Sequence, residues 1–198
     1  AQESRGLGDV YKRQVIISSA RTTARGDFGI ITSAGRLVRV HAVELASLPI
    51  TATAPSVAGG TPLADLVGLK KGERALAVTS LSGAGPSLAL GTRNGIVKRV
   101  NPELLGKESW EVIGLKNGDE VVGAVEMGDE DLELCFVTQG AALLHFPASA
   151  VRPQGRSGGG VAGIKAKDPV IFFGAAPRRG SSVVTAVSYT HLTLPTKR

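Results

Sequence analysis

The chain has 198 residues, 42% of them hydrophobic, so it is long enough to bury the core of one large domain or two small ones. Its net charge is +6, but residues 1–14 carry +1 and residues 187–198 carry +2, which leaves +3 for residues 15–186 and makes total charge a weak indicator of a polyanion partner. The single cysteine excludes an internal disulfide, and no apolar run approaches the roughly 18 residues of a membrane span, so we expect a cytoplasmic protein without membrane contact.

The two ends of the chain differ from the rest. RGLGDVYKRQ near the N-terminus and SYTHLTLPTKR at the C-terminus resemble translated adaptor sequence and share no pattern with the residues between them. We therefore expect residues 1–14 and 187–198 to be non-native tails and residues 15–186 to be part of a longer protein. The alternative is that both ends are genuine disordered termini.

A ten-residue pattern occurs three times between these ends. It reads ITSAGRLVRV at 31–40, GTRNGIVKRV at 91–100 and VTQGAALLHF at 137–146. Each copy has a threonine, a turn sequence and a returning apolar run, which is typical of a β-hairpin. The third copy has its glycine one place early, and His145 stands where Arg39 and Arg99 stand in the others.

A second pattern follows each copy of the first: GLKKGE at 68–73, GLKNGD at 114–119 and GIKAKD at 163–168. The spacing of 46 and 49 residues, with four short strands per repeat, is typical of propeller blades. The chain is thus predicted to be all-β, with blades over about 28–78, 86–125 and 132–176. Residues 46–64, rich in Pro, Ala, Thr and Gly, are predicted to form a loop inserted in the first repeat.

Basic residues recur within these patterns. Arg39 and Arg99 occupy equivalent positions, and Lys98 lies on the opposite face of its strand because side chains alternate along a strand. The segment RPQGRSGGGVAG, 152–163, could bring backbone N–H groups and the arginines Arg152 and Arg156 close to phosphate. Two other interpretations stay open: charges that protect edge strands from aggregation, and a flexible connection between blades.

The residue types needed for catalysis are not grouped in this sequence. The three histidines have no Cys or His at metal spacing, and the acidic segment EMGDED is typical of a solvated loop. We predict no catalytic residue, no metal site and no cofactor. Cys135 is predicted to pack in the core, and Trp110 is predicted to be a packing residue of the core or the rim.

IITSAGRLVRV, LALGTRNGIVKRV, WEVIGLKNGDEVVGAV and GRSGGGVAGIKAKD resemble the C-terminal domain of the A subunits of bacterial type IIA topoisomerases, gyrase and topoisomerase IV. SSARTTARGDFG, SWEVI and FPASAVRPQGRSGG look most like the A subunit of actinobacteria. The resemblance implies a β-pinwheel, a propeller-like domain of six blades, of which this chain would hold about three.

The same resemblance implies binding and bending of duplex DNA without sequence specificity, in support of ATP-dependent strand passage by a parent enzyme. The partners would be duplex DNA, the ATPase B subunit, and a second copy of the A subunit. The parent would be an isomerase, whose catalytic tyrosine lies in a breakage-reunion domain not represented in this sequence. The residues carried over for DNA contact are Arg39, Lys98, Arg99, Arg152, Arg156 and Lys165.

Two departures limit what the resemblance implies. His145 and Leu144 replace the basic pair of the second repeat, and no glutamine-arginine-arginine-glycine box is present. Whether the parent supercoils or decatenates DNA is therefore open. The alternative function is a propeller-like module that binds proteins and not DNA, in which the basic residues keep the blades soluble.

Overall fold

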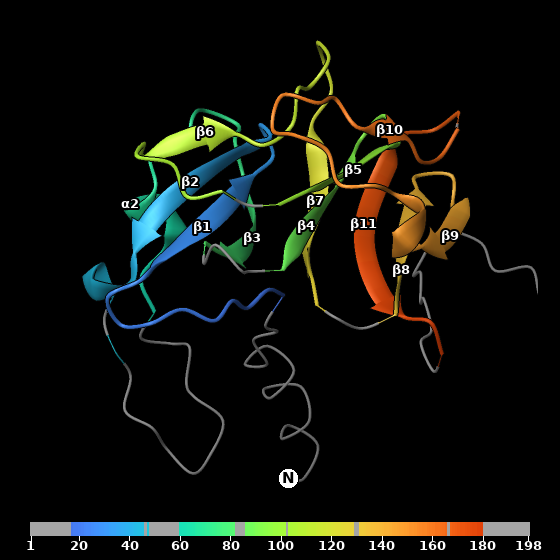
Figure 1. The fold of residues 1–198 in the computed structure, drawn as a ribbon. Helices are drawn as coiled ribbons and strands as arrows, with labels where there is room; N and C mark the ends of the chain where they lie inside the picture. Colours follow the sequence, from blue (N-terminus) through green and yellow to red (C-terminus); the bar gives the residue numbers. More distant parts are fainter. Residues whose placement is uncertain are drawn as a thin grey trace, which may run out of the picture.

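The computed structural model describes residues 17–45, 47, 60–81, 86–101, 103–128, 131–165 and 167–179. The two predicted tails, 1–14 and 187–198, lie outside these residues, as does most of the predicted loop 46–64. Figure 1 shows three antiparallel sheets standing side by side, in the order of the chain, like adjacent blades of a fan.

The strands form three sheets with one shared pattern. Blade 1 contains β1 (Asp27–Thr32), β2 (Arg36–His41), β3 (Ala75–Ser80) and β6 (Ser109–Glu111), in the order β3-β1-β2-β6. Blade 2 contains β4 (Ser87–Thr92), β5 (Ile96–Val100), β7 (Val121–Met127) and β10 (Val161–Ala162), in the order β7-β4-β5-β10. Blade 3 contains β8 (Leu132–Thr138), β9 (Leu143–Pro147) and β11 (Val170–Pro177), in the order β11-β8-β9. The helical elements are single turns: η1 (Ala42–Glu44), α2 (Leu63–Leu66) and η3 (Ala148–Ala150).

The predicted hairpins are present in all three blades, and the repeated threonine explains their shape. Thr32, Thr92 and Thr138 are buried at the end of the first strand of each hairpin. The hydroxyl of Thr92 accepts a hydrogen bond from the amide of Ile96, and that of Thr138 accepts one from the amide of Ala142. The threonine therefore closes the turn that each repeat needs.

The third strand of the second repeat and that of the third repeat each leave their own repeat. β6 follows β5 in the chain, yet it pairs with β2 and completes blade 1. In the same way β10 follows β9 and pairs with β5 in blade 2. The prediction that the four strands of one repeat form one blade is wrong in this detail, because the connection after each hairpin is long enough to reach the neighbouring sheet.

Two apolar clusters hold the blades together. Leu88, Leu90 and Val100 of blade 2 pack with Ile31 and Leu37 of blade 1. Trp110 of β6, and Val112 and Ile113 directly after it, join the same cluster. The opposite face of blade 2, including Ala89 and Val97, packs with Phe136 and Phe173 of blade 3. Trp110 and Cys135 are 6% exposed, which confirms the prediction for Cys135 and places Trp110 in the core. Blade 2 is thus buried on both faces, and only its edges and loops can meet a partner.

Candidate nucleic-acid interface

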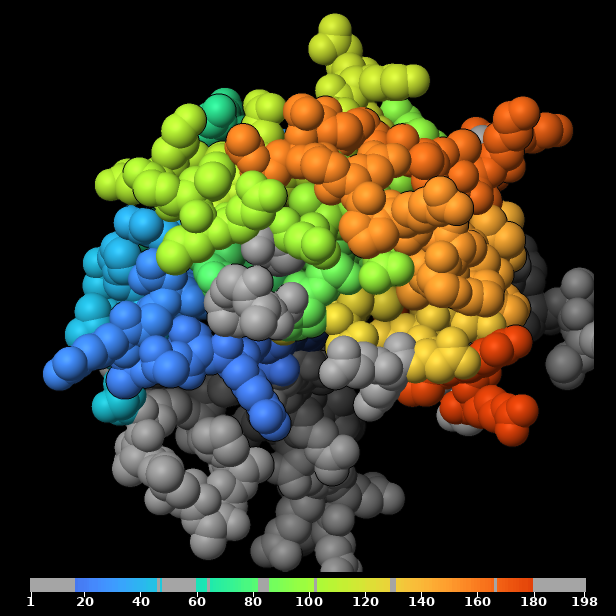
Figure 2. Space-filling model, in the orientation of Figure 1, coloured from blue at the N-terminus to red at the C-terminus, as the bar shows by residue number. Residues whose placement is uncertain are grey.

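Each exchanged strand is preceded by a connection that runs along the outer edge of the preceding blade. In blade 2 this connection and the short strand β10 that follows it make up residues 152–163, which we call the arm. The amide of Gln154 donates to the carbonyl of Arg99, and Val161 pairs with Val97, so the arm follows β5. Figure 2 shows the segment around the arm, in orange, lying at the surface against the yellow-green segment that includes β6. The arm is an ordered part of the rim of blade 2, which differs from the flexible connection considered above.

The arm carries three of the predicted residues at the surface. Arg152, Arg156 and Lys165 on or next to it are exposed, and the segment from Arg152 to Lys165 contains no acidic residue. The nearest carboxylate to Arg156 is that of Glu103, with 3.9 Å between Nε and Oε2, and both side chains are largely exposed. These three cations therefore face solvent with little neutralisation.

Two of the backbone N–H groups in the glycine-rich part of the arm are already bonded. The amide of Gly158 donates to the carbonyl of Gly155, and the amide of Gly160 donates to the side-chain oxygen of Gln154. Both groups are satisfied within the arm, so neither of these two amides is free to bind a phosphate.

Arg39 and Arg99 lie half-buried on β2 and β5, the second strands of their hairpins. The guanidinium of Arg99 donates to the carbonyls of Ala148 and Val151, at 3.1 and 3.2 Å, and to the hydroxyl of Ser87 at 3.0 Å. The guanidinium of Arg39 makes a longer bond, 3.4 Å, to the carbonyl of Leu105. Each arginine thus ties the connection of the following repeat to its own blade, and much of its hydrogen-bonding capacity is used inside the protein.

Arg39, Arg99 and His145 occupy the same position in the three hairpins, and we call them the column. The charge on this column is balanced differently in each blade. The side chains that reach it from the first strand, two places before the cross-strand partner in each blade, are those of Asp27, Ser87 and Glu133. Asp27 lies 3.9 Å from Arg39 and also pairs with His41, while Glu133 pairs with His145. In blade 2 the equivalent residue is a serine, so Arg99 has no carboxylate partner among the described residues. Blade 2 therefore carries the uncompensated charge of this column.

Lys98 lies where a direct DNA contact is impossible in this conformation. Its side chain is fully buried between β5 and the arm, and Nζ donates to the carbonyls of Arg156 at 2.6 Å and Gly158 at 2.7 Å. Burial lowers the pKa of this amine to about 8. The sequence placed Lys98 on the correct strand face, but that face is covered by the arm, so we withdraw it as a phosphate contact.

The acid of the second pattern serves the hairpin turns. Glu73 accepts two hydrogen bonds from the guanidinium of Arg36, at 2.6 and 2.8 Å, and these lower the pKa of its carboxyl to about 2. Asp119 accepts from the amide of Asn94 in the turn of blade 2. The two sequence patterns occur together because the acid of one fixes the turn of the other. The lysines of this pattern, Lys70, Lys116 and Lys165, are exposed.

Sequence reasoning missed a second group of cations at the hairpin tips. Arg74 and Arg93 both reach the carboxylate of Glu120, at 3.2 and 3.4 Å, and Lys167 lines the adjoining hollow beside Arg93. None of the three is repeated at equivalent positions in the other blades, so comparison of the repeats gave no signal for them.

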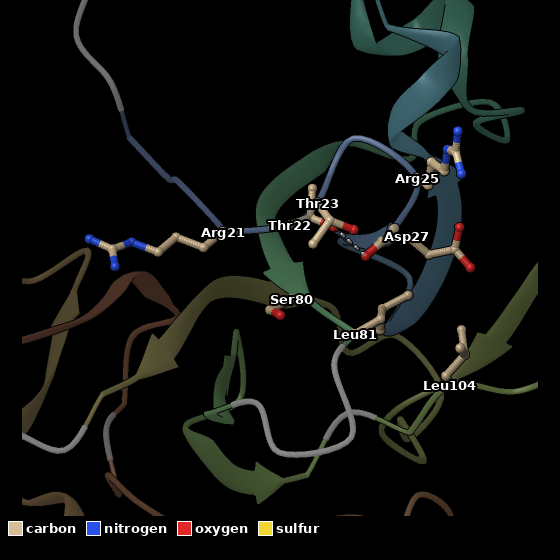
Figure 3. A pocket seen from close by; sticks show the side chains of 9 residues that line it. Arg21, Thr22, Thr23, Arg25, Asp27, Ser80, Leu81 and Leu104 are labelled. Carbon is tan, nitrogen blue, oxygen red and sulfur yellow. Dashed lines mark hydrogen bonds between the residues drawn. The ribbon is translucent and has the colours of Figure 1, made fainter.

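A larger hollow lies beside the start of β1 (Figure 3). It is lined by Thr22, Thr23 and Leu81, with Arg21 and Arg25 at its margins, and the two arginine side chains point in opposite directions. The hydroxyl of Thr22 donates to the carbonyl of Asp27. Its polar groups do not converge, so this hollow offers no catalytic arrangement.

Two further features are absent from the part of the chain that the structure describes. Within it, no three His, Cys, Asp or Glu side chains are grouped so that they could hold a metal ion. In the same residues, no helix has the length and apolar character needed to cross a bilayer.

Comparisons with known proteins agree on one family. A family profile described as the DNA gyrase C-terminal domain, beta-propeller, matches residues 86–105 and 132–174. The DNA gyrase A subunit of Mycolicibacterium smegmatis is 34% identical over 141 residues, which cover 68% of this chain and 16% of that protein. The DNA gyrase A subunit of Chlamydia trachomatis is 30% identical over 121 residues, which cover 58% of this chain and 14% of that protein. The matched part of the chain thus spans about a sixth of these relatives.

Solved structures share the fold. The C-terminal domain of a DNA topoisomerase IV superposes with a TM-score of 0.66 at 20% identity, covering 80% of this chain and 49% of that one. The C-terminal domain of E. coli ParC gives a TM-score of 0.59 at 20% identity, covering 79% of this chain and 64% of that one. These likenesses confirm the predicted all-β, propeller-like architecture.

Proposed function

Because the chain belongs with the C-terminal domains of the A subunits of gyrase and topoisomerase IV, we propose that it binds duplex DNA through the phosphates, without reading base sequence. Lys and Arg side chains that neutralise phosphates release condensed counterions, so binding of this kind needs exposed, unpaired cations along a surface. It does not need residues that reach into a groove.

The observation that carries the proposal is the basic rim of blade 2, where the segment from Arg152 to Lys165 contains no acidic residue. Arg152, Arg156 and Lys165 are exposed along the arm, and the charge of Arg99 beneath it is not balanced by a carboxylate. The corresponding edge of blade 1 has the opposite character, since exposed Glu108 and Glu111 accompany a single Lys107, while Glu103 of the same connection reaches Arg156 of the arm at 3.9 Å. A duplex is therefore attracted to blade 2 more than to blade 1.

Within a parent topoisomerase, this binding would bend DNA and guide a segment toward the gate used in ATP-dependent strand passage. The protein partners would be the ATPase B subunit, together with a second copy of the A subunit, and the complex would work in the cytoplasm on chromosomal DNA. Bending requires contacts spaced along a curved surface, so it would need basic rims on further blades of the parent in addition to that of blade 2.

The experiment is titration of a short labelled duplex with the full chain across salt concentrations from about 50 to 200 mM. The double variant Arg152→Ala/Arg156→Ala should reduce the slope of log K against log salt by up to about 1.8, since each phosphate contact contributes about 0.9. The matched control is Arg21→Ala/Arg25→Ala. It removes two exposed arginines at the same four-residue spacing, in the segment that precedes β1 and outside the arm.

If both double variants reduce the slope of log K against log salt equally, total charge and not the arm determines binding. A folded chain that binds no duplex even at the lowest salt would refute the proposal. That result would favour the alternative, a module that binds proteins through the same exposed edges.

A further inference from the structure

Lys98 is a buried cation at a position where the fold does not require one. The equivalent residues of the other repeats are Val38 and Leu144, so an apolar side chain suits this place in the hairpin. What differs in blade 2 is the segment that lies over it. The fully buried Lys98 packs beneath the glycine-rich arm, whereas Val38 is paired with Ser109 of β6.

The arm needs to be fixed because its glycines leave it few side chains with which to pack. Gly160 has a φ of 82°, and a Cβ at this residue would lie 2.6 Å from the carbonyl oxygen of Val97. Gly158 and Gly159 precede it directly. Three consecutive glycines lose much conformational freedom on folding, so local contacts must offset that loss.

Lys98 supplies such contacts at one particular place. Its Nζ binds the carbonyls of Arg156 and Gly158, and the amide of Gly114 donates to the same Gly158 oxygen at 3.2 Å. One of the two carbonyls belongs to Arg156 itself. The backbone from which this exposed arginine projects is therefore held directly by the buried lysine.

Arg152 is held by other groups. Arg99 donates to the carbonyl of Val151, immediately before Arg152, and accepts from the amide of Gln154 through its own carbonyl. The two arginines of the arm thus have separate supports: Arg99 for Arg152, and Lys98 for Arg156.

We propose that Lys98 is a positioning residue for DNA binding, which acts by fixing the arm so that Arg156 is presented to a phosphate. This inference rests on the proposed function, and it assigns to Lys98 a role in binding without any contact with DNA. Removing its two hydrogen bonds leaves Arg156 in the chain but spreads its guanidinium over many positions. The contact between Arg156 and a phosphate is then lost, because ordering the guanidinium on binding costs conformational entropy.

The test is a double-mutant cycle on the full chain with a labelled duplex, at fixed salt. Lys98→Met should weaken binding by up to about eightfold at 0.1 M salt, the value of one phosphate contact with a salt exponent of 0.9. In the Arg156→Ala background, Lys98→Met should have no further effect, because the residue that it positions is gone. In the Arg152→Ala background, which is the matched control, its effect should persist in full.

Hydrogen exchange provides a readout that is independent of DNA. The amides of Gly158 and Gly160 should exchange faster in Lys98→Met, while the amides of β4 and β7 keep their protection. Methionine is chosen because it has nearly the length of lysine and suits an apolar site. If it prevents folding, Lys98→Gln, which keeps a shorter uncharged donor, should show the same non-additivity with Arg156→Ala.

The outcomes separate the two proposals. If the wild type binds DNA and Lys98→Met binds it with the same affinity, this inference alone is overturned. The same holds if Lys98→Met still weakens binding in the Arg156→Ala background. A wild-type chain that fails to bind DNA would overturn both the proposed function and this inference.

Discussion

The turn of the third hairpin contains a residue in a backbone conformation that suits glycine. Ala141 has a φ of 62°, the one non-glycine residue with positive φ among those described, and it occupies the position of Gly35 and Gly95 in the other repeats. An L-residue in this left-handed region costs about 1–2 kcal/mol. Glycine adopts it freely but loses about 0.4–1 kcal/mol more conformational entropy on folding. Ala141→Gly should therefore stabilise the chain by about 0.5–1 kcal/mol.

For a chain of this length, that gain corresponds to an increase in Tm of about 1–4 °C, measurable by thermal and urea denaturation. The matched control is Ala142→Gly, one residue further on. Ala142 is also exposed, but it has no positive φ, and its amide and carbonyl both bond to Thr138. This control should lower Tm, since glycine in an extended segment is unfavourable. If Ala141→Gly is neutral or destabilising while the control behaves as expected, the backbone at Ala141 is not strained.

Three further predictions concern buried charges and hydrogen bonds. Arg36 holds the pKa of Glu73 at about 2, below its ordinary 4.5, so the stabilisation is complete above pH 4.5 and is lost as the pH falls toward 2. In Glu73→Gln, the free energy of unfolding should depend less on pH in that window. At neutral pH this variant should be less stable than the wild type by on the order of 2 kcal/mol. Burial holds the pKa of Lys98 at about 8, below its ordinary 10.5, so unfolding takes up a proton between these values. Stability to urea should therefore rise from pH 8 to 10.5 in the wild type and stay level in Lys98→Met. Glu126 accepts bonds from a hydroxyl and an amide of β3, joining blade 2 to blade 1, so Glu126→Ala should lower the urea midpoint by the equivalent of about 1–3 kcal/mol.

Much of the fold could be predicted from the sequence because its causes are local. The threonine, the turn and the alternating apolar residues lie within ten residues of each other, and they form the same hairpin three times. The pairing of the exchanged strands could not be predicted in this way. Alternation identifies a strand but not the edge with which it pairs, and β6 pairs with residues about 70 positions earlier in the chain.

The candidate site was predicted in part, for the same reason. Alternation correctly placed Lys98 and Arg99 on opposite faces of β5. It could not show that one face is covered by the arm, since the arm follows Lys98 by more than 50 residues. Arg152 and Arg156 were predicted from their place beside the glycine run and from the family resemblance, and the structure places both at the surface.

The three repeats diverge at the residues that set charge, and this divergence explains why one rim should bind DNA. The column on the second strand is Arg39, Arg99 and His145. A carboxylate faces the column in the first and third blades, whereas blade 2 has Ser87. A hydrogen bond to serine holds the guanidinium in place as a carboxylate would, but it leaves the positive charge intact. In a repeat protein the backbone is fixed by residues that all repeats share, so exchanges at the rim can change its charge without changing the fold. Substituting Ser87→Asp should therefore neutralise Arg99, keep the hairpin, and weaken duplex binding at low salt more than at high salt, which a salt titration of this variant would test.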